Sequence, residues 1–206
     1  MSMDRLSPDN AAFLSIDHQT GLANGIQDQS IPEFMTGISA LAKTAKAYKL
    51  PTVITTSAAN GPNGPVMPTV AETQPDATVV HRPGEINAFD NPDFAAAVKN
   101  TGRKKLIIAG ISTEVCVAFA AIAAVEAGYD VYAVIDASGT WNKLVQEVAI
   151  QRMVQAGVKP ITWVAVAAEL QGDWRSPTGQ DLAAIMAEYL PFYGNLIGSF
   201  MATQKD

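Results

Sequence analysis

The chain has 206 residues, of which 48% are hydrophobic and 17% are charged, and its formal net charge is −6. This apolar content is enough to bury both faces of a sheet, and the low charge excludes a disordered chain. The acidic balance argues against a nucleic-acid-binding protein, which needs a basic surface, so we expect no nucleic-acid partner.

Short β-branched runs alternate with helical patterns along the chain, which is typical of βαβ units around a parallel sheet. We predict strands at residues 11–17, 52–56, 78–81, 105–109, 130–136 and 159–164. Helices are predicted at residues 32–48, 92–100, 113–127 and 143–156, after residue 164, and at 181–189. Gly102, Gly128 and Gly157 follow helical runs, where a left-handed cap is expected. The predicted fold class is α/β: a doubly wound, Rossmann-like three-layer αβα sandwich with a six-stranded parallel sheet, in a single domain over residues 1–206.

The last segment, about residues 178–206, is predicted to be a helical appendage to a sheet that is already complete. It carries so many apolar side chains that leaving them exposed to water would be unfavourable. We therefore expect it either to cover the chain's own core or to dock on a neighbouring subunit. These side chains are Tyr189, Leu190, Phe192, Tyr193, Leu196, Ile197 and Phe200.

The sequence carries no sign of a membrane or secreted protein. No apolar run reaches the roughly 18 residues that span a bilayer. The N-terminal residues around Asp4 and Asp9 lack the basic and apolar regions of a signal peptide. The single cysteine, Cys116, excludes an intramolecular disulfide and fits a reducing compartment. We therefore expect a cytoplasmic protein without a membrane partner.

Three reactive side chains follow predicted strands. Asp17 closes the first strand, Arg82 follows the third and Cys116 follows the fourth. Ligands of open α/β sheets bind outside the carboxyl ends of the strands, so these side chains are expected to meet at one rim.

Cys116 lies at the start of a predicted helix. With Thr113 as the N-cap, the thiol falls in the first turn, where unpaired amides and the helix dipole favour an anion. Such a position lowers the pKa of a thiol and makes it a nucleophile, and the free amides of this turn, with that of Ser112, would receive an oxyanion. The alternative is a buried cysteine that only packs the helix.

Asp17 is the candidate base, because a buried carboxylate needs a partner and Arg82 can hold it ionised. Arg82 is alternatively an ordinary structural ion pair. His18 and His81 adjoin these residues and are interpreted as structural, with replacement of Asp17 by one of them as a minority hypothesis. Two histidines without a ligand spacing motif predict no metal, and we expect no cofactor.

Three segments resemble the isochorismatase-like cysteine hydrolases, with the closest likeness to the YcaC-type branch. They are Asp17-His18-Gln19, the run from Arg82 to Asp90, and the run from Ala109 to Val117. The resemblance implies a six-stranded parallel sheet, a triad of Cys116, Asp17 and Arg82, and an oxyanion hole made of the Ser112 and Cys116 amides. It also implies a non-proline cis peptide, here between Ile111 and Ser112. The branch is associated with large homo-oligomers, which makes an octamer one candidate.

The sequence differs from part of this family in one respect. Many members that hydrolyse amides have lysine where this chain has Arg82, and the nicotinamidases add histidine-rich metal ligands that this chain lacks. We therefore do not expect nicotinamide specificity.

The predicted function is hydrolysis of a small molecule, at an amide or related C–N bond, through a thioester on Cys116. One alternative is isochorismatase-like opening of a vinyl ether without a cysteine adduct. The other is a catalytically silent, oligomeric binding or scaffold protein. The candidate pocket residues are Gln19, Asn87, Phe89, Thr113 and Trp141.

Overall fold

The computed structural model describes residues 4–203. Its centre is one sheet of six parallel strands in the order β3-β2-β1-β4-β5-β6. The sheet confirms the predicted α/β class. Its strands are β1 (Ala11–Ile16), β2 (Thr52–Ser57), β3 (Thr78–Arg82), β4 (Lys105–Gly110), β5 (Asp130–Val134) and β6 (Lys159–Ile161).

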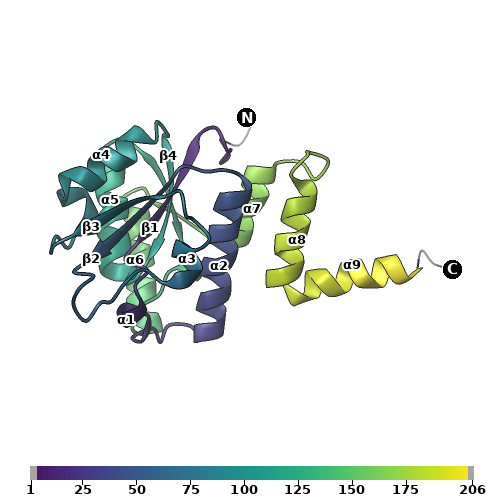
Figure 1. The fold of residues 1–206 in the computed structure, drawn as a ribbon, viewed down its shortest axis with the longest axis horizontal. Coiled ribbons are helices and arrows are strands. Elements are labelled where there is room, and N and C mark those ends of the chain that lie inside the picture. The colour runs from purple at the N-terminus through teal and green to yellow at the C-terminus, as the bar shows by residue number, and fades with distance from the viewer. Residues whose placement is uncertain (1–3, 204–206) are drawn as a thin grey trace.

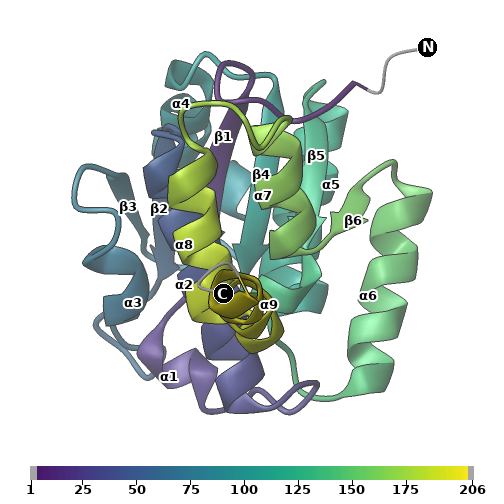
Figure 2. The same ribbon diagram turned by 90° about the vertical axis from the view of Figure 1, so that its right-hand side faces the viewer.

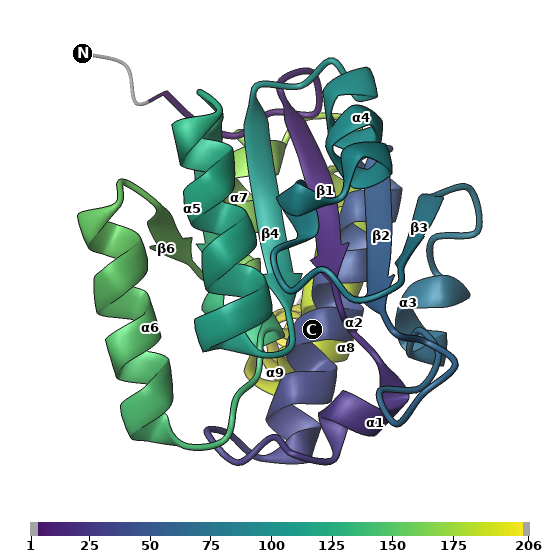
Figure 3. The ribbon, with the colours of Figure 1, turned by 90° about the vertical axis from the view of Figure 1, so that its left-hand side faces the viewer.

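Helices cover both faces of the sheet and make the three layers that the sequence predicts. One face is covered by α4 (Pro92–Asn100), α5 (Ala118–Glu126) and α6 (Lys143–Gln155), which stand in front of the sheet in Figure 3. The other face is covered by α2 (Ile31–Ala47) and α7 (Trp163–Gln171), as Figure 2 shows. The short helices α1 (Thr20–Ala23) and α3 (Pro68–Ala71) and the 3-10 turn η1 (Ala88–Asp90) lie in the connections.

Local sequence explains where α2 begins. The Ser30 side chain accepts a hydrogen bond from the Glu33 amide, and the Glu33 carboxylate accepts one from the Ser30 amide. This capping box satisfies two amides that the helix leaves unpaired. Phe34, Ile38 and Leu41 then repeat along one side and are buried against the sheet.

The first four strands end within one residue of the prediction, and the last two end earlier than predicted by more than one residue. β5 stops at Val134, because the chain enters the 3-10 turn η3 (Ile135–Ala137). β6 stops at Ile161, because α7 begins at Trp163 and its first amide donates to the Asp136 carboxylate at 2.9 Å. The predicted ends at residues 136 and 164 were therefore wrong. Gly102, Gly128 and Gly157 have the predicted left-handed conformation, with φ of 67°, 86° and 91°.

The C-terminal appendage consists of two helices with different surroundings. α8 (Gly179–Tyr189) buries Leu182, Ile185 and Met186 and packs beside α2. α9 (Pro191–Thr203) buries no residue and extends away from the rest of the molecule in Figure 1. Its large apolar side chains are exposed: Phe192, Leu196, Ile197, Phe200 and Met201. Thus α8 covers the chain's own core, and α9 has an apolar surface without cover in the single chain.

None of the helices within residues 4–203 combines the length and the apolar character needed to cross a bilayer.

The strand order reverses between β1 and β4, so the two central strands mark the point where open α/β sheets bind ligands. Ile16 and Gly110 are partners at the carboxyl ends of these strands. A Cβ atom at Gly110 would lie 1.9 Å from the carbonyl oxygen of Ile16, so only glycine allows this approach. β1, which precedes Asp17, and β4, which precedes the turn that holds Cys116, are therefore in close main-chain contact.

Candidate active site

The predicted pair of Asp17 and Arg82 is present at the carboxyl edge of the sheet. Asp17 directly follows β1 and has a left-handed backbone, with φ of 53°, a conformation that Asp tolerates better than most residues. Nη2 of Arg82 donates to both Asp17 carboxylate oxygens at 2.5 Å. Both side chains have an exposed fraction of 0%. The carboxylate and the guanidinium form a buried ion pair.

The remaining N–H groups of Arg82 are also bound. Nε donates to Oγ1 of Thr55 at 3.0 Å, and Nη1 donates to the main-chain oxygens of Glu85 and Ile86. Because a guanidinium has five N–H groups, these contacts and the pair with Asp17 use all of its donors. Arg82 is therefore fixed in orientation, and its side-chain charge is paired with Asp17.

Cys116 lies in a π-helical turn, η2 (Thr113–Val117), which continues into α5. Ser112 is the N-cap, and its carbonyl oxygen accepts from the Val117 amide at 3.0 Å. The predicted N-cap at Thr113 was therefore wrong by one residue, and Cys116 is the fourth residue of the turn. The peptide bond between Ile111 and Ser112 is cis.

The thiol is not ionised at rest. Burial raises the pKa of Cys116 to about 12, and the negative charge of Asp17 and its hydrogen bond with the thiol act in the same direction. The Ser112 amide and the charge of Arg82 oppose this rise only in part. The expectation of a lowered thiol pKa was wrong, because desolvation and the neighbouring carboxylate outweigh the helix start.

Asp17 is placed to accept the thiol proton. Burial raises the pKa of its carboxyl, whereas the hydrogen bond and the charge of Arg82, together with the hydrogen bond from Cys116, oppose the rise. A carboxylate with a raised pKa is a better proton acceptor than an exposed one. The arrangement is therefore a neutral thiol beside a base that a buried cation holds in place.

A pocket of about 300 Å³ opens above these groups. Asp17, Ser112 and Cys116 lie in its wall, and Trp141 is the one predicted pocket residue that lines it. Sequence reasoning missed six further lining residues. Three of them, Ile86, Glu114 and Val115, belong to the segments that carry the family resemblance. The six are Leu22, Ser57, Asn63, Ile86, Glu114 and Val115.

Four predicted pocket residues lie outside this lining. The Gln19 amide is buried and donates to the carbonyl oxygens of Ser57 and Gly64 at 3.1 and 2.5 Å, which fixes the loop that carries Asn63. The other three have local packing roles. The Asn87 side chain caps η1, the Phe89 ring packs edge-on against Phe94 at 5.2 Å, and the Thr113 side chain is buried.

Neither histidine takes the place of Asp17. His18 is buried, with Nδ1 at 2.8 Å from Oγ of Ser15 and Nε2 at 2.9 Å from the carbonyl oxygen of Ala137. Burial lowers its pKa to about 4. His81 contacts Oγ1 of Thr56 at 2.7 Å. Neither side chain lines the pocket, and within residues 4–203 no three His, Cys, Asp or Glu side chains gather as metal ligands.

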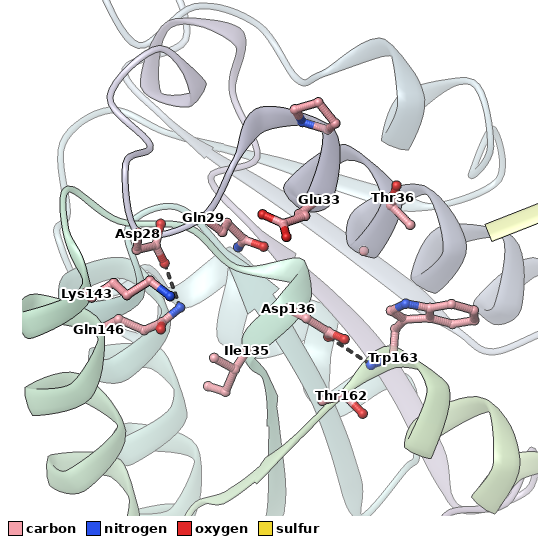
Figure 4. A pocket seen from close by; sticks show the side chains of 12 residues that line it. Asp28, Gln29, Glu33, Thr36, Ile135, Asp136, Lys143, Gln146, Thr162 and Trp163 are labelled. Atoms are coloured by element: carbon pink, nitrogen blue, oxygen red, sulfur yellow. Dashed lines mark hydrogen bonds between the residues drawn. The ribbon is translucent and has the colours of Figure 1, made fainter. Parts of the chain in front are cut away.

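A larger pocket, of about 580 Å³, lies between α2, the end of β5, α6 and the start of α7 (Figure 4). Its carboxylates hold structural contacts. Asp28 accepts a hydrogen bond from Gln146 at 2.7 Å, and Asp136 accepts the Trp163 amide at 2.9 Å. Burial raises the pKa of Asp136 to about 6. None of its lining residues is a nucleophile activated by a base, so the smaller pocket at Cys116 is the candidate active site.

Comparison with known proteins agrees with this geometry. The sequence model described as the isochorismatase domain matches residues 11–165. The chain belongs to the isochorismatase family. A similar protein, the probable hydrolase YcaC of Escherichia coli (strain K12), is 47% identical over 201 residues, which cover 98% of this chain and 96% of the relative. This assignment makes the protein an isochorismatase-like hydrolase.

Two solved structures share nearly the whole fold. YcaC from Pseudomonas aeruginosa, with hexane-2,5-diol and covalent acrylamide, has a TM-score of 0.94 and 48% identity, and covers 97% of this chain and 98% of its own. YcaC from Escherichia coli, described as an octameric hydrolase of unknown specificity, has a TM-score of 0.95 and 47% identity, and covers 98% and 99%. These relatives support the fold and the hydrolase class without naming a substrate.

Proposed function

We propose that this protein hydrolyses a small molecule at an amide or related C–N bond, with Cys116 as the nucleophile. The observation that carries the proposal is that the Cys116 thiol and the buried, Arg82-paired Asp17 carboxylate lie in the wall of one pocket. Asp17 is the base and Arg82 holds it ionised and oriented. The amides of Ser112 and Cys116 form the oxyanion hole.

The first half of the reaction forms a thioester. Asp17 takes the thiol proton as the sulfur attacks the carbonyl carbon, because the thiol is neutral before attack. The carbonyl oxygen becomes an oxyanion, and the two amides stabilise its charge. Protonated Asp17 then passes the proton to the nitrogen, the C–N bond breaks, and the amine leaves.

The second half restores the enzyme. A water molecule loses a proton to Asp17 and attacks the thioester carbon, which forms a second oxyanion at the same amides. The C–S bond breaks, the acid is released, and the sulfur recovers the proton from Asp17. Arg82 gains and loses no proton, since its guanidinium stays charged throughout.

A relative supports a reactive nucleophile at this kind of site. The Pseudomonas aeruginosa YcaC structure contains covalent acrylamide, a small amide whose alkene accepts a thiolate. Because that chain is 48% identical to this one, we extend the same reactivity to Cys116.

We also propose a homo-oligomer, with an octamer as the candidate size. The Escherichia coli relative is described as octameric and matches 98% of this chain. The exposed apolar side chains of α9 supply a surface for a second copy of the chain.

The test is turnover of a panel of small amides and thioesters by wild type and Cys116→Ala, with mass spectrometry to detect acylated Cys116. We expect acylation in wild type and loss of turnover in the variant. Turnover that persists in Cys116→Ala would instead favour vinyl-ether chemistry without a cysteine adduct. A stable assembly in which no compound of the panel acylates Cys116 or is turned over by wild type would favour a binding or scaffold protein.

A further inference from the structure

The pocket at Cys116 contains a second carboxylate that the proposed reaction does not use. Glu114 lies two residues before the nucleophile on η2, is partly buried and lines the pocket. Its Oε2 accepts a hydrogen bond from Oγ1 of Thr140 at 2.5 Å. Within residues 4–203, Oε1 has no hydrogen-bond partner, so it remains as an acceptor for a bound molecule.

The pocket offers no cation to a ligand. In the part of the chain that the structure describes, none of the lining residues is Lys, Arg or His. Arg82 lies behind Asp17 with every N–H already bound, so it neutralises Asp17 and has no donor left for a substrate. The charge that a ligand meets is therefore that of Glu114.

Apart from Asp17, whose charge Arg82 neutralises, the rest of the lining is uncharged. Leu22, Ile86, Val115 and Trp141 give an apolar wall, and Asn63 and Ser57 add polar groups. A carboxylate bound here would lie near Glu114 without a counter-ion and would lose its water, which is unfavourable. An amide N–H₂ or an ammonium group would instead donate to Oε1 of Glu114.

We propose that Glu114 sets the charge of the substrate: the site takes small neutral amides or amines that present an N–H donor, and excludes carboxylates. This proposal rests on the proposed function and names its substrate class. It also counts against an acidic vinyl-ether substrate, because such a molecule brings a carboxylate into the same pocket.

The test uses two alkylating agents of nearly equal size, iodoacetamide and iodoacetate, on the single cysteine. The measured quantity is the ratio of their second-order rate constants at one pH, compared with the same ratio for free cysteine. In wild type we expect the ratio to favour iodoacetamide well beyond free cysteine. In Glu114→Gln it falls by about fivefold to tenfold, as Coulomb's law gives for charges roughly 6 Å apart at an effective dielectric constant of about 40 to 60, between the values for a protein surface and for water.

Thr140→Val is the matched control. It removes the hydrogen bond to Glu114 and keeps the carboxylate, so the ratio stays within about twofold of wild type if charge is the cause. A purely structural role of Glu114 would change both rate constants together and leave the ratio unchanged.

Two other results distinguish a failure of the Glu114 proposal from a failure of the proposed function. If Cys116 reacts with both agents and the ratio is the same in wild type and Glu114→Gln, the charge selection by Glu114 is wrong, and the cysteine mechanism stands. If neither agent modifies Cys116 at any pH at which the protein stays folded, and no amide acylates it, the proposed function is wrong and the inferred substrate class is wrong as well.

Discussion

Nη2 of Arg82 donates to both carboxylate oxygens of Asp17, and each N–O distance is 2.5 Å. A single donor nitrogen thus lies between the two oxygens, and solvent reaches neither side chain. The carboxylate cannot rotate away from Cys116 without breaking both contacts. The proposed base, Asp17, is therefore ordered before a substrate arrives, which reduces the reorganisation that the proposed reaction needs.

The first prediction concerns Asp17→Asn. The negative charge of Asp17 helps to raise the pKa of Cys116, so its removal lowers that pKa and shifts the alkylation profile by iodoacetamide to lower pH. Hydrolysis nevertheless falls by about 100-fold or more, because the base is lost. Alkylation rates across pH and turnover are measured on the same samples.

Asp136→Asn is the control for that experiment, since it neutralises a buried carboxylate outside the active-site pocket. Its alkylation profile should match wild type. An unshifted profile in Asp17→Asn would show that the carboxylate does not act on the thiol.

The second prediction concerns the stability of the buried pair. Arg82→Gln leaves the Asp17 carboxylate without its cation, so the free energy of unfolding falls by about 3–5 kcal/mol at neutral pH. Urea denaturation measures the change. The comparison is Lys43→Gln, which breaks the exposed pair with Glu188 and costs less than about 1 kcal/mol. Equal losses in the two variants would contradict a tightly coupled buried pair.

The third prediction is a pH dependence of stability that Asp136 causes. Its pKa is raised from 3.8 to about 6 in the fold, so its contribution to stability is complete below pH 3.8 and is lost as the pH rises through about 6. Asp136→Asn resembles the protonated form and still accepts the Trp163 amide.

We therefore expect Asp136→Asn to be more stable than wild type at pH 7.5 by about 1–2 kcal/mol, allowing for partial solvent access. At pH 3.5 the two proteins should be equally stable. Thermal unfolding at both pH values measures the difference, and other titrating groups cancel because both proteins contain them. A difference that does not change with pH would exclude Asp136 as its source.

The fourth prediction concerns α9. Leu196→Ser with Phe200→Ser removes two exposed apolar side chains, so the assembly dissociates to smaller species while the sheet remains folded. Sedimentation velocity measures the size and circular dichroism the fold. Asn195→Ser, an exposed polar change on the same helix, should keep the assembly intact. An unchanged size in the double variant would place the interface elsewhere.

Strand periodicity and chain order were enough to predict the sheet and to bring Asp17, Arg82 and Cys116 to one edge. This prediction succeeded because the carboxyl ends of parallel strands lie at one edge of the sheet, and their position does not depend on the loops that follow. The pocket lining was not predictable in the same way. Asn63 reaches the pocket because Gln19 binds the carbonyl oxygens of Ser57 and Gly64, a contact between distant segments.

The thiol pKa shows the same limit. Position in the first helical turn predicts a lowered pKa, but burial of Cys116 and the charge of Asp17 decide its value. Both depend on the packing of several segments, which periodicity does not reveal. The single π-helical turn at η2 likewise shifts the cap from Thr113 to Ser112 without a sequence signal that we can identify.

The close approach of Gly110 to Ile16 means that the central strands tolerate substitution less than the pocket walls do. The reacting groups are held by main-chain contact between central strands, where even one added methyl group is excluded. The pocket walls come from connecting segments such as those of Asn63, Ile86 and Trp141, which tolerate replacement. Substitutions in these loops can therefore change the wall of the pocket without moving the two central strands.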